Sequence, residues 1–136
     1  MPILNVSVTG GADPKRSAAI AGKLTELTNV HLGKDPTLTA VAIQHVDRDH
    51  WFIGGETLSR RNAESFMLRI SVTEGTNTKP QMAAYVEAVF AAMAKLLGRL
   101  DDVSYVVVEE VPAGAWGYGG TTQEFRYIAG RLQSAA

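Results

Sequence analysis

The stretch Met1-Pro2-Ile3-Leu4-Asn5-Val6-Ser7-Val8-Thr9 sets how the rest of the chain is interpreted. Leu4, Val6 and Val8 occupy alternate positions, which is the period of a β-strand with one buried face. Because a methionine before proline is normally trimmed during synthesis, we expect the mature chain to begin with the free secondary amine of Pro2. A strand that starts there would hold this amine inside the protein, where it could act as a base or a nucleophile. The alternative is that proline is merely tolerated as the first residue of a strand, where no ladder donor is missed.

Length and charge limit the classes of protein to consider. A chain of 136 residues has the size of one domain, and its 46% hydrophobic content is sufficient for a core. Its 13 basic and 14 acidic residues nearly cancel, so nothing favours nucleic acid as a partner.

The sequence contains no cysteine, which excludes disulfides, thiolate catalysis and cysteine metal sites. No charged and apolar leader opens the chain, and no apolar run approaches the roughly 18 residues of a membrane span. We therefore expect a cytoplasmic protein without a membrane partner.

The first part of the chain has the pattern of a β-α-β unit. Asp13-Pro14 predicts a helix start and Gly33 a helix end, with Thr39 to Val46 as the following strand. The expected buried face of this helix consists of Ile20, Leu24, Leu27 and His31. Such a unit has parallel strands joined by a right-handed crossover.

A polar segment, Glu56 to Glu64, is the candidate linker to a second unit of the same plan. The expected elements there are a strand from Phe66 to Thr73, a helix that opens at Thr78-Lys79-Pro80 and ends at Gly98, and a strand from Tyr105 to Val111. The expected buried face of this helix consists of Met82, Val86, Val89, Met93 and Leu96 with Leu97. A tail with Phe125, Tyr127 and Leu132 follows the last strand.

The two units repeat one another in sequence. Val6-Ser7-Val8-Thr9 matches Ile70-Ser71-Val72-Thr73 at an offset of 64 residues (70 − 6), and the pattern Trp-x-x-Gly-Gly recurs at 51–55 and 116–120. We therefore expect one α/β domain over residues 1–136, made of units 1–60 and 61–136, with a four-stranded sheet that carries two helices on one face. The opposite face would be too apolar to stay exposed at Ile3, Phe66 and Met67, so we expect it to pack against other copies in a closed oligomer.

These features resemble the tautomerase superfamily, typified by 4-oxalocrotonate tautomerase. The resemblance rests on Pro2 at the head of a β-α-β unit, on Glu110-Val111-Pro112 and on the run Trp116 to Gly120. Two fused units, with Phe66 where the second would have its proline, look like the double-length branch of that superfamily. The resemblance implies a homotrimer that needs no cofactor and no metal and acts on a small carboxylate.

The same resemblance implies roles for particular residues. Pro2 would be the general base and acid of a keto-enol tautomerisation of a 2-oxo or 2-hydroxydienoic acid, and Trp116, Tyr118 and Phe125 would wall its pocket. Burial among such side chains disfavours the charged form of an amine and lowers its pKa. The alternatives are a malonate semialdehyde-type decarboxylase or hydratase, because the tail is similar to that group, and a degenerate trimer that serves as a binding scaffold.

The family's carboxylate-binding arginines have no match here, since Ala12, Ala40 and the loop from Thr73 to Asn77 stand at their places. The possible substitutes are Arg60, Arg61, Arg69 and Arg126. Arg69 is the foremost of them as a substrate-binding residue, with a structural salt bridge as the alternative. The segment His45 to His50 contains two histidines and two aspartates, which are residue types that bind metals. The alternative, which we favour, is the end of a strand followed by a solvated loop.

Overall fold

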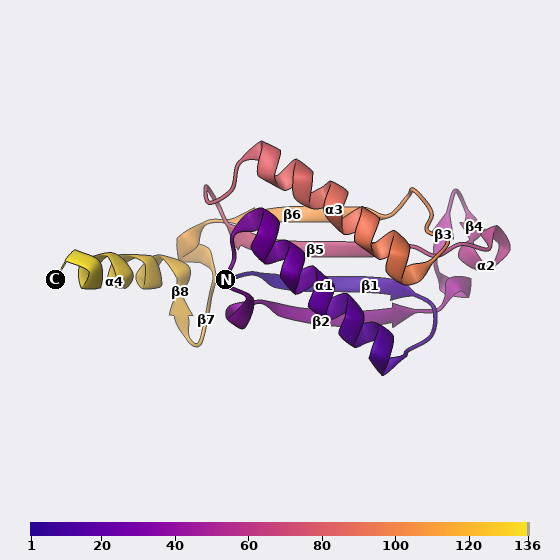
Figure 1. Cartoon of the computed structure of the whole chain (residues 1–136), viewed down its shortest axis with the longest axis horizontal. Coiled ribbons are helices and arrows are strands. Elements are labelled where there is room, and N and C mark those ends of the chain that lie inside the picture. The colour runs from indigo at the N-terminus through magenta and orange to yellow at the C-terminus, as the bar shows by residue number, and fades with distance from the viewer. Residues whose placement is uncertain (136) are drawn as a thin grey trace.

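The computed structural model describes residues 1–135 and places four strands in one sheet (Figure 1). The strands are β1 (Ile3–Thr9), β2 (Ala40–Val46), β5 (Phe66–Thr73) and β6 (Tyr105–Val111), in the order β2-β1-β5-β6. Each repeat contributes one parallel pair, β1 with β2 and β5 with β6. The repeats join through the antiparallel pair of β1 and β5, where Val6 lies opposite Leu68. The expected α/β architecture of two β-α-β units is confirmed.

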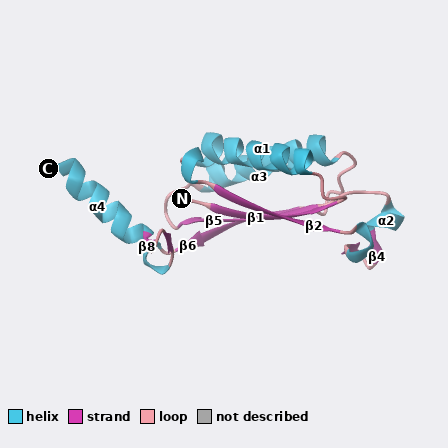
Figure 2. Ribbon diagram, turned by 90° about the horizontal axis from the view of Figure 1, so that it is seen from below, coloured by secondary structure: helices cyan, strands magenta, loops and turns pink. Residues whose placement is uncertain are grey.

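Two long helices, α1 (Pro14–Leu32) and α3 (Lys79–Leu97), cover the same face of the sheet (Figure 2). The Asp13 side chain accepts a hydrogen bond from the Lys15 backbone N–H, so it caps α1 as predicted. Gly33 ends that helix in the left-handed conformation, with φ 68°, which a glycine adopts without steric cost. Thr78 and Gln81 form a reciprocal capping box at the start of α3.

The core lies between the helices and the sheet, but the buried helix faces are rotated from the predicted ones. The buried positions of α1 are Ile20, Leu24, Thr28 and Leu32, and those of α3 are Tyr85, Val89, Met93 and Leu97. A buried hydrogen bond of 2.9 Å between Thr28 Oγ1 and Tyr85 Oη joins the two helices and explains the rotation. The periodicity of purely apolar residues misses this polar pair, so the predicted faces were partly wrong.

Phe66 was also misplaced by the sequence analysis, because its side chain is fully buried under the helices rather than on the opposite face. That opposite face is open and carries Asn5 and Arg69, with Ile3 and Met67 half-buried. Figure 2 shows α1 and α3 together on the other side of the sheet.

The repeat extends to the segments after each parallel pair. Hairpin β3 (Phe52–Ile53) with β4 (Glu56–Thr57) and hairpin β7 (Gly117–Tyr118) with β8 (Thr121–Thr122) have the same pairing, shifted by 65 residues (117 − 52). Short 3₁₀ helices precede them, η2 (Arg48–His50) and η3 (Ala113–Ala115), and another, η1 (Pro36–Leu38), precedes β2.

A helix follows each hairpin at equivalent positions: α2 (Leu58–Arg61) and the longer α4 (Gln123–Ala135). The predicted linker from Glu56 to Glu64 is therefore a hairpin strand and a helix whose Leu58 is fully buried. The predicted tail is the helix α4, which extends from the sheet at the end where the N-terminus lies (Figure 1). Among the described residues no helix has the length and apolar character needed to cross a membrane.

Candidate active site

The head of β1 is fixed inside the protein. Pro2 is buried, and its carbonyl accepts a hydrogen bond of 3.3 Å from the Ala40 backbone N–H at the start of β2. Met1, which precedes Pro2 and carries the amino group of the chain, is half-buried. After removal of Met1, the free amine would be the Pro2 nitrogen, one residue further into the protein.

Met1 lines a cavity of ≈ 730 Å³ at the end of the sheet where β5 and β6 finish. The rest of its lining comes from the end of β5 and from the C-terminal region: Thr73, Glu74, Thr76, Ala113, Tyr118, Gln123, Glu124, Arg126, Tyr127 and Ile128. The volume lies in the range of roughly 300–1,000 Å³ typical of small-molecule sites. The second repeat therefore builds the walls around the amine of the first.

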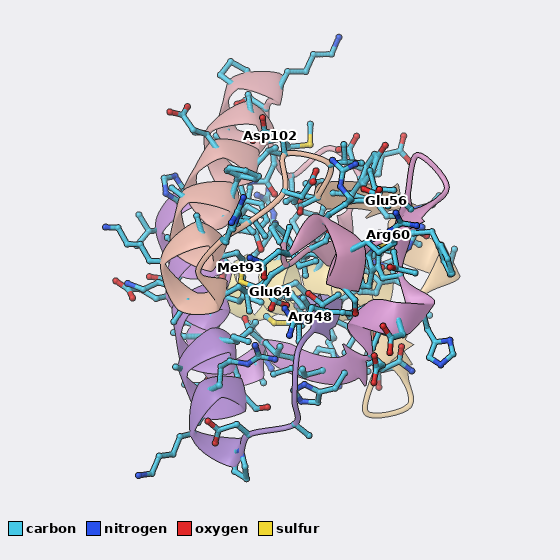
Figure 3. The ribbon with its side chains drawn as sticks, turned by 90° about the vertical axis from the view of Figure 1, so that its right-hand side faces the viewer. Arg48, Glu56, Arg60, Glu64, Met93 and Asp102 are labelled. Atoms are coloured by element: carbon cyan, nitrogen blue, oxygen red, sulfur yellow. The ribbon has the colours of Figure 1, made fainter. Side chains whose placement is uncertain are left out.

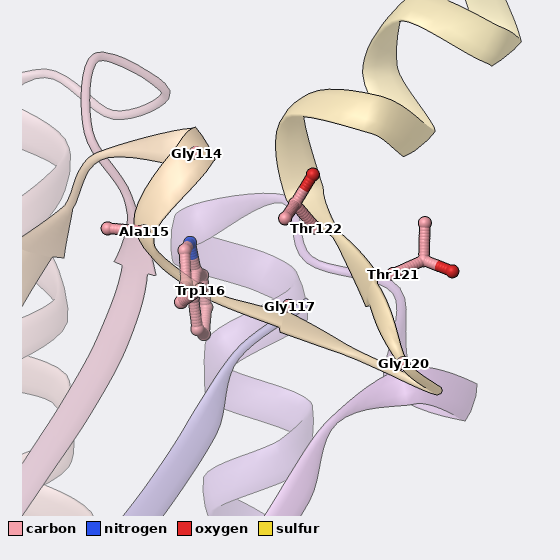
Figure 4. Close-up of a pocket in the computed structure, with 7 residues that line it drawn as sticks. All are labelled: Gly114, Ala115, Trp116, Gly117, Gly120, Thr121 and Thr122. Carbon is pink, nitrogen blue, oxygen red and sulfur yellow. The ribbon is translucent and has the colours of Figure 1, made fainter.

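Trp116 anchors the hairpin that carries this wall. Its indole Nε1 donates a hydrogen bond of 3.2 Å to Thr73 Oγ1 at the end of β5. Figure 4 shows Trp116 between the η3 turn and the hairpin, beside a smaller hollow of ≈ 270 Å³. Gly117 follows it, and a Cβ there would come within 2.0 Å of the Thr121 carbonyl oxygen across the hairpin, so only glycine fits.

Tyr118 and Arg126 form a stacked pair on the cavity wall. The Arg126 guanidinium carbon lies 3.9 Å from the centroid of the Tyr118 ring, and Arg126 Nη2 donates a 3.0 Å hydrogen bond to the Tyr118 carbonyl. Cation–π contact of this kind fixes the orientation of a guanidinium. Gln123, one turn earlier on α4, donates from Nε2 to the Met1 carbonyl at 3.5 Å.

The electrostatics of the amine follow from its surroundings. Burial, and then the positive charge of Lys34, hold the pKa of the Met1 amine below its ordinary value, while Asp35 opposes them. Burial also lowers the pKa of Lys34, whose Nζ donates 2.9 Å to Thr76 Oγ1 on the cavity wall. Lys34 and Gln123 were not singled out by the sequence analysis, because no motif marks them and only the fold brings them to the N-terminus.

The structure brings together only some of the residues that the sequence proposed for the site. Tyr118 lines the cavity with Met1, and Trp116 anchors the hairpin that carries Tyr118 through its hydrogen bond to Thr73. Phe125 is 63% exposed on α4 and borders a separate hollow near the hairpin rather than this cavity. Arg69 lies on the open sheet face, where its Nη1 pairs with Glu109 at 3.2 Å, so in this chain it has the structural salt bridge that was the alternative.

The equivalent place at the opposite end of the sheet is the start of β5, where the chain does not begin but continues from the first repeat. There the chain runs continuously into Phe66, and the Thr9 hydroxyl accepts a 2.9 Å hydrogen bond from the Ser65 backbone N–H and contacts the Glu64 carboxylate. Figure 3 shows Glu64 beside Arg48, to which it is paired at 3.4 Å. The Phe66 nitrogen is a peptide amide, so this end has no free amine, although a hollow of ≈ 320 Å³ is lined there by Gly10, Gly11, Asp47, Arg48, Asp49 and Ser59.

No group of three or more histidine, aspartate or glutamate side chains gathers as a metal site within residues 1–135. In particular, His45 contacts the Ser17 hydroxyl through Nε2 at 3.1 Å.

Comparison with known proteins agrees with the duplicated architecture. The family model of tautomerase enzymes matches twice, over residues 2–61 and 67–126. The probable tautomerase K2 of Dickeya dadantii (strain 3937) is 37% identical over 67 residues, covering 48% of this chain and 98% of that protein. A fused 4-OT solved as a symmetric trimer superposes with a TM-score of 0.76 at 21% identity, over 90% of this chain and 96% of the other. Pt0534, solved after inactivation by 2-oxo-3-pentynoate, superposes with a TM-score of 0.79 at 17% identity, over 91% and 98%. The chain therefore belongs to the tautomerase family of isomerases, as a fused protein that carries two copies of the family's unit.

Proposed function

We propose that this tautomerase uses the amine of Pro2, exposed by removal of Met1, as the general base and acid that interconverts the enol and keto forms of a small 2-oxo acid. The observation that carries the proposal is buried Pro2 directly behind Met1, which lines a ≈ 730 Å³ cavity. Burial and Lys34 lower the pKa of the Met1 amine, and we expect the same surroundings to act on the Pro2 amine next to it. A general base works best when its pKa lies near the operating pH.

The reaction requires one proton to leave oxygen and one to arrive at carbon. The neutral amine accepts the hydroxyl proton of the enol, the O–H electron pair becomes the carbonyl π bond, and the double-bond electrons take a proton at the adjacent carbon. The protonated amine supplies that proton. Tyr118 lines the cavity on one side, and the fixed Pro2 backbone holds the nitrogen at one position.

Two features of the relatives support this assignment. Pt0534 is inactivated by a 2-oxo compound, 2-oxo-3-pentynoate, which indicates that the shared fold admits this substrate class. The fused 4-OT is a trimer, and the open sheet face of this chain, with Ile3 and Met67 half-buried on it, is the surface through which three copies would associate.

The test is ketonisation of phenylenolpyruvate, followed by the loss of enol absorbance, on protein whose intact mass shows that Met1 has been removed. Preparations that retain Met1 should be inactive, because the Pro2 nitrogen is then an amide. Carbon dioxide release from malonate semialdehyde, measured in parallel, would assign the decarboxylation instead. Equal ketonisation by trimmed and untrimmed protein would contradict the role of the amine.

A further inference from the structure

Arg126 differs from the other arginines that could bind a substrate. Arg61 and Arg69 are each paired with a carboxylate, Asp101 at 2.9 Å and Glu109 at 3.2 Å. Arg60 lies on α2, at the far end of the sheet from Met1. Within residues 1–135, Arg126 makes no ion pair, although it lines the same cavity as Met1. Its buried Nε has no hydrogen-bond partner there.

The Arg126 guanidinium is nevertheless held in place. It stacks on the Tyr118 ring and donates one of its five N–H groups to the Tyr118 carbonyl. A Cβ at position 119 would come within 2.9 Å of Nη2, so Gly119 leaves the space that the guanidinium occupies. A positioned guanidinium with unused donors matches the planar, two-pronged geometry of a carboxylate.

We propose that Arg126 binds the carboxylate of the substrate, and that the cavity selects a 2-oxo monocarboxylate with an apolar tail over a dicarboxylate. This inference rests on the proposed function, since it names the substrate class of the same site. Arg126 on the C-terminal helix α4 then makes the carboxylate contact that the family's arginines, absent from this chain, would make.

The charges on the wall provide the selectivity. Glu74 and Glu124 line the cavity with Arg126, and neither forms an ion pair within the described part of the chain. Two carboxylates so placed repel a second negative group on the substrate. Ala113 and Ile128 provide apolar surface on the same wall for an uncharged tail.

Binding of inert ligands tests the proposal without turnover. Calorimetry should show that 3-phenylpropanoate binds more tightly than adipate, and that Arg126→Gln weakens 3-phenylpropanoate by roughly 10- to 100-fold, the scale of a hydrogen bond to a charged group. Arg131→Gln, an exposed change on the same helix, is the matched control and should leave binding unchanged. Glu74→Gln with Glu124→Gln should tighten adipate. Tighter binding of adipate by the unaltered protein would refute the selectivity.

Hydrogen exchange at C3 separates a carboxylate contact from a structural role. The rate of deuterium incorporation at C3 is measured by NMR in deuterated buffer, for phenylpyruvate and for its methyl ester. Arg126→Gln should lower the rate for the acid by roughly 10- to 100-fold and the rate for the ester little. Arg126→Lys should restore part of the loss, because it returns the charge without the planar fork.

The outcomes also separate this inference from the proposed function. If Arg126→Gln lowered the exchange rates of acid and ester equally, the role of Arg126 would be overturned while the enzyme remained Pro2-dependent. The same would follow if Lys34→Gln, and not Arg126→Gln, lowered the rate for the acid alone. Absence of exchange with either substrate, combined with Arg126-dependent binding of 3-phenylpropanoate, would refute the proposed chemistry and retain the carboxylate site.

Discussion

Trp116 Nε1 donates its hydrogen bond to Thr73 Oγ1 at 3.2 Å, and this contact ties the C-terminal hairpin to the end of β5 beside the N-terminus. The two residues are 43 positions apart in sequence but belong to the same repeat. The link therefore positions the wall that Tyr118 and α4 present to Met1. The site is shared between the strand of the first repeat and the hairpin of the second.

Trp116→Phe should lower the free energy of unfolding by about 1 kcal/mol, because a part-buried hydrogen bond is lost and the Thr73 hydroxyl keeps no protein donor. It should also lower kcat/KM by loosening Tyr118. Urea denaturation and ketonisation kinetics measure the two effects.

The repeat offers a matched control, Trp51→Phe, at the opposite end of the sheet. This variant should keep kcat/KM within about twofold, since the hairpin of β3 and β4 that Trp51 precedes lies at the end of the sheet opposite the N-terminus. A double-mutant cycle that combines Trp116→Phe with Thr73→Val should show a coupling free energy of about 0.5 kcal/mol or more. Additive effects would mean that the hydrogen bond does not carry the link.

Pro2→Ala should reduce turnover by on the order of 10²-fold or more, the scale of a positioned general base, while the fold is retained. An alanine amine is primary and lacks the ring that fixes φ, so both its basicity and its position change. Stopped-flow or absorbance kinetics on protein of verified N-terminus provide the measurement. Phe66, the equivalent residue, has no amine to lose, so chemistry in the second repeat is not expected.

Unchanged turnover in the Pro2→Ala protein would exclude Pro2 as the base. An amine-directed acylating reagent gives an independent measure, and it should label Pro2 before the exposed lysines near neutral pH, because ordinary lysines stay protonated with a pKa of about 10.4.

The regular part of the fold could be predicted from sequence because each signal acts locally. Alternation in β1, the Asp13 and Gly33 caps and the Trp-x-x-Gly-Gly repeat each depend on neighbouring residues. The tautomerase resemblance was confirmed for the same reason, since its motifs lie at the ends of these elements.

The rest depended on contacts between distant residues. Tyr85 and Thr28 are buried in place of more apolar residues of their helices because they form a hydrogen bond with each other in the core. Lys34 and Arg126 are 92 positions apart (126 − 34); Lys34 contacts Thr76 on the cavity wall from the loop after α1, and Arg126 lines the cavity from α4. Phe66 was assigned to the open face because hydrophobicity was read without the register, which buries it under the helices.

Tyr85→Phe should destabilise the protein by about 1 kcal/mol through loss of the hydrogen bond to Thr28. The Thr28 hydroxyl still bonds to the Leu24 carbonyl at 2.7 Å, so no orphaned group adds to the cost. Exposed Tyr105→Phe is the control, and urea denaturation is the measurement.

The titration of Tyr85 gives the same contact a pH signature. Burial raises the pKa of Tyr85 to about 12, so the native state favours its neutral form. Its stabilising contribution is present below the unfolded value of about 10 and is lost as the pH rises through the folded value. Stability of the unaltered protein should fall over this window more steeply than that of Tyr85→Phe, and parallel curves would contradict the assignment.

Met67→Glu should disrupt the proposed trimer, because it places a charge on the open sheet face, where Met67 lies opposite Ser7 on β1. Sedimentation velocity should show a trimer for the unaltered protein and smaller species for this variant. Val30→Glu, at a 65% exposed position on α1, should remain trimeric. A unaltered protein that sediments as a monomer would refute the association.

Lys34→Gln should move the acid limb of the kcat/KM profile to higher pH. Catalysis requires the neutral amine, so kcat/KM rises as the pH rises through the amine's pKa and is flat above it. At the Met1 amine, burial lowers the pKa first and the Lys34 charge lowers it further, while Asp35 raises it, and we expect the same charges to act on the adjacent Pro2 amine. Removing only the Lys34 charge therefore raises the pKa of the amine and leaves less neutral amine at any pH on the limb.

The effect of salt provides a second measure of the same interaction, with Lys23→Gln as the control, since Lys23 is paired with Glu26 on an exposed part of α1. Added salt screens the Lys34 charge in the unaltered protein and should move its acid limb in the same direction as the substitution. The limb of Lys34→Gln should respond less, because the charge being screened is gone. The plateau above the limb should stay equal in all three proteins, since the neutral amine is the same base in each. A limb that stays in place or moves to lower pH in Lys34→Gln would show that Lys34 does not set the protonation of the amine.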